Sequence, residues 1–143
     1  MKTVVTEKAP AAIGPYSQAQ ICGNFVFASG QIPIIPETGA IAEGLEAQAN
    51  QVFKNIAALL KAAGSDISKT VKTTVFIKNM DDFSAINAIY ANYFSEPYPA
   101  RSCVLSENGF MTNEKECRWL MTEEAVEAIA MAHVEGIVNY LAK

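Results

Sequence analysis

The sequence predicts a single α+β domain whose strands and helices follow one another in the order β-β-α-β-α-β. Two segments carry apolar residues at helical spacing, and others carry β-branched and aromatic residues in alternation. Clusters of glycine and proline separate these segments. A chain of 143 residues has the usual length of one domain, and neither an internal repeat nor a linker divides it.

The first two strands are predicted to form a hairpin. Residues 23–33, GNFVFASGQIP, alternate along the chain as a strand does. One face carries Phe25, Phe27 and Ser29, and the other carries Val26 and Ala28. The preceding segment, YSQAQI, is expected to pair with this strand through a turn at residues 22–24. The following IPETGAIAEG is rich in turn residues and is expected to be an exposed loop.

A helix is predicted from Glu46, because apolar residues recur at steps of three and four. They are Ala49, Val52, Phe53, Ile56, Leu59, Leu60 and Ala63. Gly64 stands where a glycine typically ends a helix. One apolar stripe of this helix is therefore expected to face the core.

The second half of the pattern is a strand, a helix and another strand. Residues 70–78, TVKTTVFIK, alternate β-branched residues with polar or aromatic ones and predict a strand. Asp81 or Asp82 is expected to cap the next helix. The apolar stripe of that helix is Phe83, Ile86, Tyr90, Tyr93 and Phe94. Arg101 then begins the following strand.

Composition excludes several functional classes. The formal net charge is −4, from 11 basic and 15 acidic residues, and no basic run forms the footprint that nucleic acid or an anionic membrane requires. No signal peptide or membrane span is indicated. Three widely spaced cysteines, Cys22, Cys103 and Cys117, predict no disulfide framework and suit a reducing cytoplasm. His133 is the one histidine, so neither a His-centred metal site nor a Ser-His-Asp triad is predicted.

Arg101, in the stretch YPARSCVLSENGF, is the most informative polar residue. A guanidinium beside a strand that should be largely buried requires a partner, and its planar fork matches a carboxylate. A glutamate of the protein or a bound ligand can supply that carboxylate. Cys103 is expected to share a strand face with Arg101, as a buried structural thiol or as a nucleophile. Ser29 and Gly30 indicate either a turn or a close approach to a ligand.

Four segments, APAAIGPYSQA, ASGQIP, VKTTVFIKNMDDFSAINAIYANYF and YPARSCV, closely resemble the Rid family of reactive intermediate deaminases, in particular its RidA subgroup. The resemblance spans about residues 3 to 104. It implies a chorismate-mutase-like α+β fold, with two helices on one face of a mixed sheet, assembled as a homotrimer with clefts at the interfaces. It also implies hydrolysis of 2-imino or 2-enamino acids to 2-keto acids and ammonia, without a metal or organic cofactor.

The resemblance also assigns site residues. The carboxylate-binding arginine of the family falls on Arg101, its cleft tyrosine on Tyr16 and its serine on Ser29. Asn87 and Cys103 match two further cleft positions, and the backbone at Gly30 and Cys103 is expected to offer hydrogen bonds. The glutamate that activates water in the family falls on Glu127, in EAVEAIA.

Residues 105–143 depart from the family pattern. Twenty-two residues, from Leu105 to Val126, separate the arginine motif from Glu127, more than relatives have. Two interpretations stay open. The first is an insertion, then a closing strand, AVEAIAM, and a C-terminal extension of one or two helical turns, HVEGIVNYLAK. The second is one helix over residues 122–143 with Glu127 on its surface. The second interpretation would favour a non-catalytic module that binds keto acids, in place of the deaminase. An RNA-acting or chaperone-like role has less support.

Overall fold

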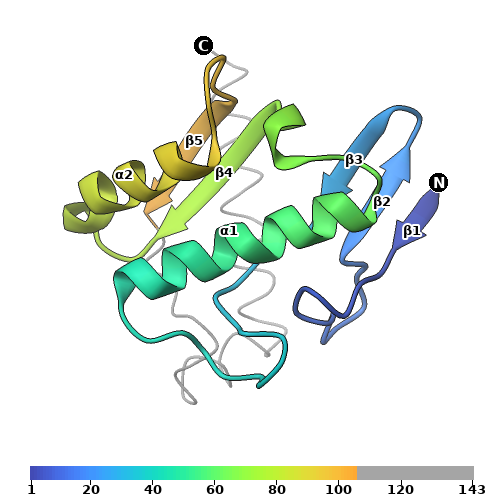
Figure 1. The fold of residues 1–143 in the computed structure, drawn as a ribbon, viewed down its shortest axis with the longest axis horizontal. Helices are drawn as coiled ribbons and strands as arrows, with labels where there is room; N and C mark the ends of the chain where they lie inside the picture. The colour runs from blue at the N-terminus through green and yellow to red at the C-terminus, as the bar shows by residue number, and fades with distance from the viewer. Residues whose placement is uncertain (106–143) are drawn as a thin grey trace, which may run out of the picture. The chain divides into compact units, whose positions relative to one another are not determined.

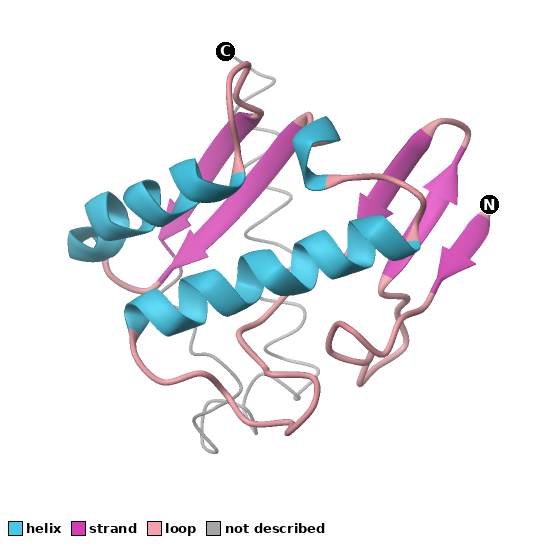
Figure 2. Ribbon diagram, in the orientation of Figure 1, coloured by secondary structure: helices cyan, strands magenta, loops and turns pink. Residues whose placement is uncertain are grey.

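A computed structural model describes residues 1–105, and Cys117, Glu127 and His133 lie outside the described residues. The elements are β1 (Lys2–Val4), β2 (Ala19–Cys22), β3 (Phe25–Ala28), α1 (Leu45–Ala62), β4 (Lys72–Ile77), α2 (Phe83–Tyr93) and β5 (Ala100–Leu105), with short 3-10 turns at Ile67–Lys69 and Met80–Asp82. Figures 1 and 2 show both helices on the same side of the strands. The predicted order of elements is confirmed, with β1 added before it.

The strands of residues 1–105 form two sheets, whereas the family resemblance implies one mixed sheet. The first is antiparallel in the order β1-β2-β3, and the second is the parallel pair β4-β5. The predicted hairpin is confirmed, because β2 pairs with β3 from Ala19↔Ala28 to Cys22↔Phe25. Its turn contains Gly23, whose φ of 56° is a conformation that glycine adopts without strain.

The predicted end of α1 at Gly64 is also confirmed. Gly64 has φ 78°, and its N–H donates to the carbonyl of Lys61 at 3.0 Å, while the N–H of Ser65 donates to the carbonyl of Leu60 at 2.9 Å. These two bonds form a Schellman motif and satisfy carbonyls that the end of the helix leaves unpaired.

The predicted cap of α2 is confirmed in position but makes no capping hydrogen bond. Asp82 occupies the N-cap position but makes no side-chain hydrogen bond to the helix. A 3-10 turn precedes α2, and the side chain of Asn79 caps that turn by accepting from the N–H of Asp81 at 3.0 Å. The unpaired N–H groups that need a cap therefore lie three residues earlier than the apolar periodicity indicates.

Asp66 caps the turn before β4. Its carboxylate accepts from the N–H and the hydroxyl of Ser68, at 2.9 and 2.7 Å. These hydrogen bonds hold the pKa of Asp66 below its ordinary value, the backbone bond contributing most. Because the folded chain favours the charged form, this contribution to stability is present at neutral pH and is lost as the pH falls through the lowered pKa.

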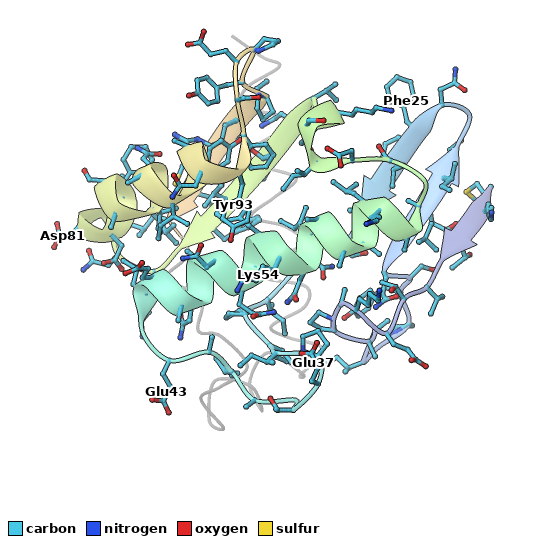
Figure 3. The ribbon with its side chains drawn as sticks, viewed as in Figure 1. Phe25, Glu37, Glu43, Lys54, Asp81 and Tyr93 are labelled. Atoms are coloured by element: carbon cyan, nitrogen blue, oxygen red, sulfur yellow. The ribbon has the colours of Figure 1, made fainter. Side chains whose placement is uncertain are left out.

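Helix α1 joins the two halves of the domain. Its Leu59 is buried with the strand residues Val4 and Ala19 in a first core cluster. Its Phe53 is buried in a second cluster with Tyr90 and other residues of the α2 region. Tyr93, labelled in Figure 3, stacks on the Phe53 ring with centroids 4.8 Å apart. One helix thus sets the position of β4 and α2 relative to the hairpin.

A buried asparagine on α1 anchors the loop that follows Gly30. Asn55 is 1% exposed. Its Nδ2 donates to the carbonyls of Ile32 and Ile34 at 3.0 and 2.9 Å, and its Oδ1 accepts from Gln51 at 2.8 Å. A single side chain therefore satisfies two loop carbonyls and ties the loop to the helix.

Replacing Asn55 with alanine should lower the free energy of unfolding by about 2–4 kcal/mol, because both carbonyls lose their donor and a small cavity forms. Urea denaturation followed by circular dichroism measures the change. Asn92→Ala, at an exposed position of α2, is the matched control. Equal losses in the two variants would contradict the anchoring role of Asn55.

Candidate functional site

Arg101 and Cys103 lie on the face of β5 that turns toward the helices. In the parallel pair, Arg101 is opposite Thr73 and Cys103 is opposite Val75. Residues opposite each other in such a pair project to the same face, and Val75 packs against the second core cluster. The prediction that Arg101 and Cys103 share a strand face is therefore confirmed.

The Arg101 guanidinium lies over two aromatic rings of α2. Its Cζ is 4.8 Å from the ring centroid of Tyr90 and 5.4 Å from that of Phe83. The Tyr90 hydroxyl is 2.9 Å from Oγ1 of Thr73, the residue opposite Arg101. The faces of electron-rich rings attract a cation. The positive charge is thus stabilised within residues 1–105 by aromatic rings and not by a carboxylate.

Two expectations about this strand are wrong. β5 is exposed along its whole length, although the sequence suggested a largely buried strand. The reason is that, within residues 1–105, β5 pairs on one side only, with β4, and so forms the edge of its sheet. Cys103 is accordingly an exposed free thiol and not a buried structural one.

Asn87 lies on the same face of α2 as the two rings. It follows Phe83 by four residues and precedes Tyr90 by three, and residues at these spacings are neighbours on a helix surface. Its Oδ1 is buried and accepts no hydrogen bond from the described part of the chain. A buried acceptor without a donor is costly. The face of α2 that carries the two rings therefore also holds a buried acceptor with no partner in residues 1–105.

Ser29 joins the end of β3 to the segment before β2. Its hydroxyl donates to the carbonyl of Ser17 at 2.6 Å, and its N–H donates to the carbonyl of Gln18 at 3.0 Å. Both bonds continue the β2–β3 pairing beyond Ala19↔Ala28, so they are contacts between strand ends and not local turn contacts. The hydroxyl proton is used in the bond to Ser17, but the oxygen keeps lone pairs that can accept a hydrogen bond from a ligand. Tyr16 is half exposed, and Gly30 has open space on its side-chain side.

Sequence reasoning missed Gln18, which organises the same region. Gln18 is 4% exposed. Its Oε1 accepts from the N–H of Thr6 at 2.7 Å, and its Nε2 donates to the carbonyls of Thr6, Ala9 and Pro10 at 3.0, 3.2 and 2.8 Å. No periodicity or spacing distinguishes this glutamine, since its partners lie 8 to 12 residues away. It ties the N-terminal segment to β2 next to Tyr16.

The predicted site residues of the described chain fall into two groups. Arg101 and Cys103 share one face of β5, and the guanidinium of Arg101 lies over rings of α2, the helix that carries Asn87. Tyr16, Ser29 and Gly30 belong to the ends of the β2–β3 hairpin. Two surface hollows, of about 430 and 360 Å³, lie elsewhere. They are lined by residues 43–47 with Asn50, and by residues 68–71 with 95–99. Neither hollow contains a predicted site residue.

Other kinds of site are not seen in the part of the chain that the structure describes. Over residues 1–105, no group of three or more histidine, cysteine, aspartate or glutamate side chains is placed to hold a metal ion. Neither described helix is long and apolar enough to cross a membrane.

Comparison with known proteins places these residues in a family context. The family described as Endoribonuclease L-PSP matches residues 6–108. A 2-iminobutanoate/2-iminopropanoate deaminase of Salmonella typhimurium is 52% identical over 106 residues, which cover 72% of this chain and 83% of that protein. A Lactococcus lactis protein named putative regulator AldR is 51% identical over 105 residues, 73% of this chain and 83% of that one. The crystal structure of RidA from an Antarctic Psychrobacter matches with a TM-score of 0.72 and 46% identity, over 74% of this chain and 86% of that chain.

Proposed function

Because this chain belongs to the Rid family of reactive intermediate deaminases, we propose that it hydrolyses short 2-imino acids and their 2-enamino tautomers to 2-keto acids and ammonia. Typical substrates would be 2-iminobutanoate and 2-iminopropanoate. The observation that carries the proposal is the Arg101 guanidinium, which contacts aromatic rings beside the unpaired acceptor of Asn87. Such an activity would protect pyridoxal-phosphate enzymes from these intermediates.

In this proposal Arg101 binds the substrate carboxylate. A guanidinium donates two parallel hydrogen bonds to a carboxylate, which sets both the position and the orientation of the ligand. Arg101 is exposed on β5 in the described part of the chain, so a small anion can reach it. Fixing the carboxylate also fixes the adjacent imine carbon, and such positioning is a large part of catalysis when two reactants must meet.

The reaction itself requires proton transfers but no electron acceptor. A water oxygen bonds to the C=N carbon while one water proton leaves and the nitrogen gains a proton, which gives a carbinolamine. The C–N bond then breaks, ammonia leaves with the bonding pair as its nitrogen takes up a further proton, and the hydroxyl loses its proton to form the ketone. Because an imine carbon is already electrophilic, we expect neither a metal nor an organic cofactor to take part.

Several residues are proposed to serve these steps. Glu127, which lies outside the described residues, would take the proton of the attacking water, on the strength of the EAVEAIA motif. Oδ1 of Asn87 and Oγ of Ser29 are acceptors suited to the N–H of the substrate. The Tyr16 hydroxyl and the backbone at Gly30 and Cys103 would donate further hydrogen bonds.

The proposal includes a homotrimer in the cytoplasm, with clefts between subunits. Apolar side chains are exposed on strand faces turned away from the helices, namely Phe25 at 61%, Phe27 at 63%, Phe76 at 58% and Val104 at 39%. Exposed apolar surface of this kind is typical of an interface. An interface would also bring the two groups of site residues together in clefts between subunits. A light-scattering mass of one 15.4 kDa chain would contradict this assembly.

A second candidate function is a non-catalytic module that binds 2-keto acids through the same arginine. This candidate is supported by the relative at 51% identity, which is named a putative regulator, AldR. An RNA-cleaving function, to which the family description points, has weaker support. The net charge of −4 and the lack of a basic run offer little attraction to a phosphate backbone.

A coupled assay tests the proposed function. A pyridoxal-phosphate dehydratase or an amino-acid oxidase generates the imine, semicarbazide traps what escapes hydrolysis, and semicarbazone absorbance is followed with and without this protein. We expect the protein to suppress semicarbazone formation. No suppression by a folded protein that still binds 2-oxobutanoate would favour the binding module. No suppression and no binding would contradict both functions.

A further inference from the structure

We propose that Tyr90 is a positioning residue for Arg101, and that Thr73 in turn holds Tyr90. The inference rests on the proposed function, because it concerns how the carboxylate-binding arginine is held ready for its ligand. Three features of the described chain support it: the contact between Arg101 and the ring, the hydrogen bond of the ring hydroxyl, and the packing behind the ring.

The first two features are linked by the strand register. Thr73 is the residue of β4 directly opposite Arg101. Its Oγ1 is 2.9 Å from the Tyr90 hydroxyl, and the Tyr90 ring centroid is 4.8 Å from Cζ of Arg101. The pairing that places the arginine on its strand therefore also places the hydroxyl group that orients the ring. The strand pair, the Tyr90 ring and the Arg101 guanidinium are thus joined by consecutive contacts.

The third feature is the packing of the Tyr90 ring, which is fixed in the core, whereas the Arg101 side chain is exposed. Tyr90 is 5% exposed and packs against Phe53 and Phe94, with ring centroids 5.7 and 4.3 Å away. Arg101 is exposed on β5, as residues 1–105 are described. A long exposed side chain loses rotamer entropy when a ligand immobilises it. A guanidinium already held over a fixed ring loses less, so the carboxylate binds more tightly.

This role predicts an effect on ligand binding more than on the chemical step. Tyr90→Leu should raise the Kd for 2-oxobutanoate, a stable keto-acid product, by about tenfold. KM for the imine should rise in parallel, and kcat should change by less than about threefold. Tyr90→Phe keeps the ring and should stay within about twofold of wild type, and Thr73→Val should cost about twofold by loosening the ring.

A matched control separates positioning from stability. Tyr93 is another aromatic residue of α2 that packs on Phe53, at 4.8 Å, and its hydroxyl donates to Asn50. Tyr93→Leu should therefore lower Tm much as Tyr90→Leu does, while leaving the Kd for 2-oxobutanoate unchanged. Equal weakening of binding by the two variants would overturn the proposal, because core damage would then explain both.

Two further measurements make the test independent of turnover. In an Arg101→Ala background, Tyr90→Leu should change the Kd no further, and additive effects would contradict the positioning role. By NMR, the side-chain signals of Arg101 should show ring-current shifts in the wild-type protein that become smaller in Tyr90→Leu, where only the Phe83 ring remains. Unshifted Arg101 signals in the wild type would refute the inference. Lack of both turnover and 2-oxobutanoate binding, with those shifts present, would refute the proposed function instead.

Discussion

Arg101→Ala should lower kcat/KM for 2-iminobutanoate by about 10²–10³-fold. The substitution removes two charge-assisted hydrogen bonds to the substrate carboxylate, each among the stronger kinds in proteins, and it also loses the orientation that they impose. Because Arg101 is exposed, the free energy of unfolding should fall by less than about 1 kcal/mol. Semicarbazone suppression at several imine concentrations measures the activity, and urea denaturation measures the stability.

A matched control removes a different cation from the same pair of strands. Lys72 lies on β4, on the face opposite to Arg101, and its Nζ donates to Ser102 at 2.8 Å. Lys72→Ala should leave kcat/KM within about twofold of the wild-type value. An equal loss in the two variants would show that the net charge of the sheet, and not the Arg101 fork, attracts the substrate. Arg101→Lys should recover only part of the activity, since an ammonium cannot form the two-pronged contact.

Glu127→Gln should lower kcat by about 10²–10⁴-fold while leaving the Kd for 2-oxobutanoate unchanged. The amide keeps the size of the side chain but cannot take a proton from water, and general-base catalysis contributes an effect of this order. Suppression of semicarbazone formation at saturating imine gives kcat, and calorimetry gives the Kd. Glu124→Gln, three residues earlier in the same segment, is the matched control and should retain activity.

The outcome for Glu127 also decides between the two interpretations of the C-terminal segment. A steep loss of turnover with binding intact would favour the closing strand that brings Glu127 to the cleft. Unchanged turnover would remove Glu127 from the mechanism and favour a carboxylate on a helix surface. Retained binding without any turnover in the wild-type protein would instead favour the keto-acid-binding module.

Local features of this chain follow from the sequence itself. The Gly23 turn of the hairpin, the Schellman end of α1 at Gly64 and the alternation of β4 were all predicted and are all present. Each depends on hydrogen bonds or side-chain periodicity within a few residues, so a short window of sequence contains the cause. The resemblance to the family likewise depends on contiguous motifs, and it identified Arg101 and Asn87 as residues that the fold brings to one place.

Features that depend on distant partners needed the tertiary structure. β1 is three residues long and exists because it pairs with β2, some fifteen residues further on. The exposure of β5 reflects which strands lie beside it, and periodicity carries no such information. The same holds for the buried Gln18, whose four hydrogen bonds reach across a loop.

The candidate site shows this division most clearly. The sequence alone determined that a guanidinium stands at the head of a strand and that an aromatic stripe lies along the preceding helix, because both are local patterns. Only the tertiary structure decided that the two meet. The parallel register places Arg101 opposite Thr73, and the packing of α2 places Tyr90 between them and the core. Such contacts depend on the free energy of packing between whole elements, which no single segment contains.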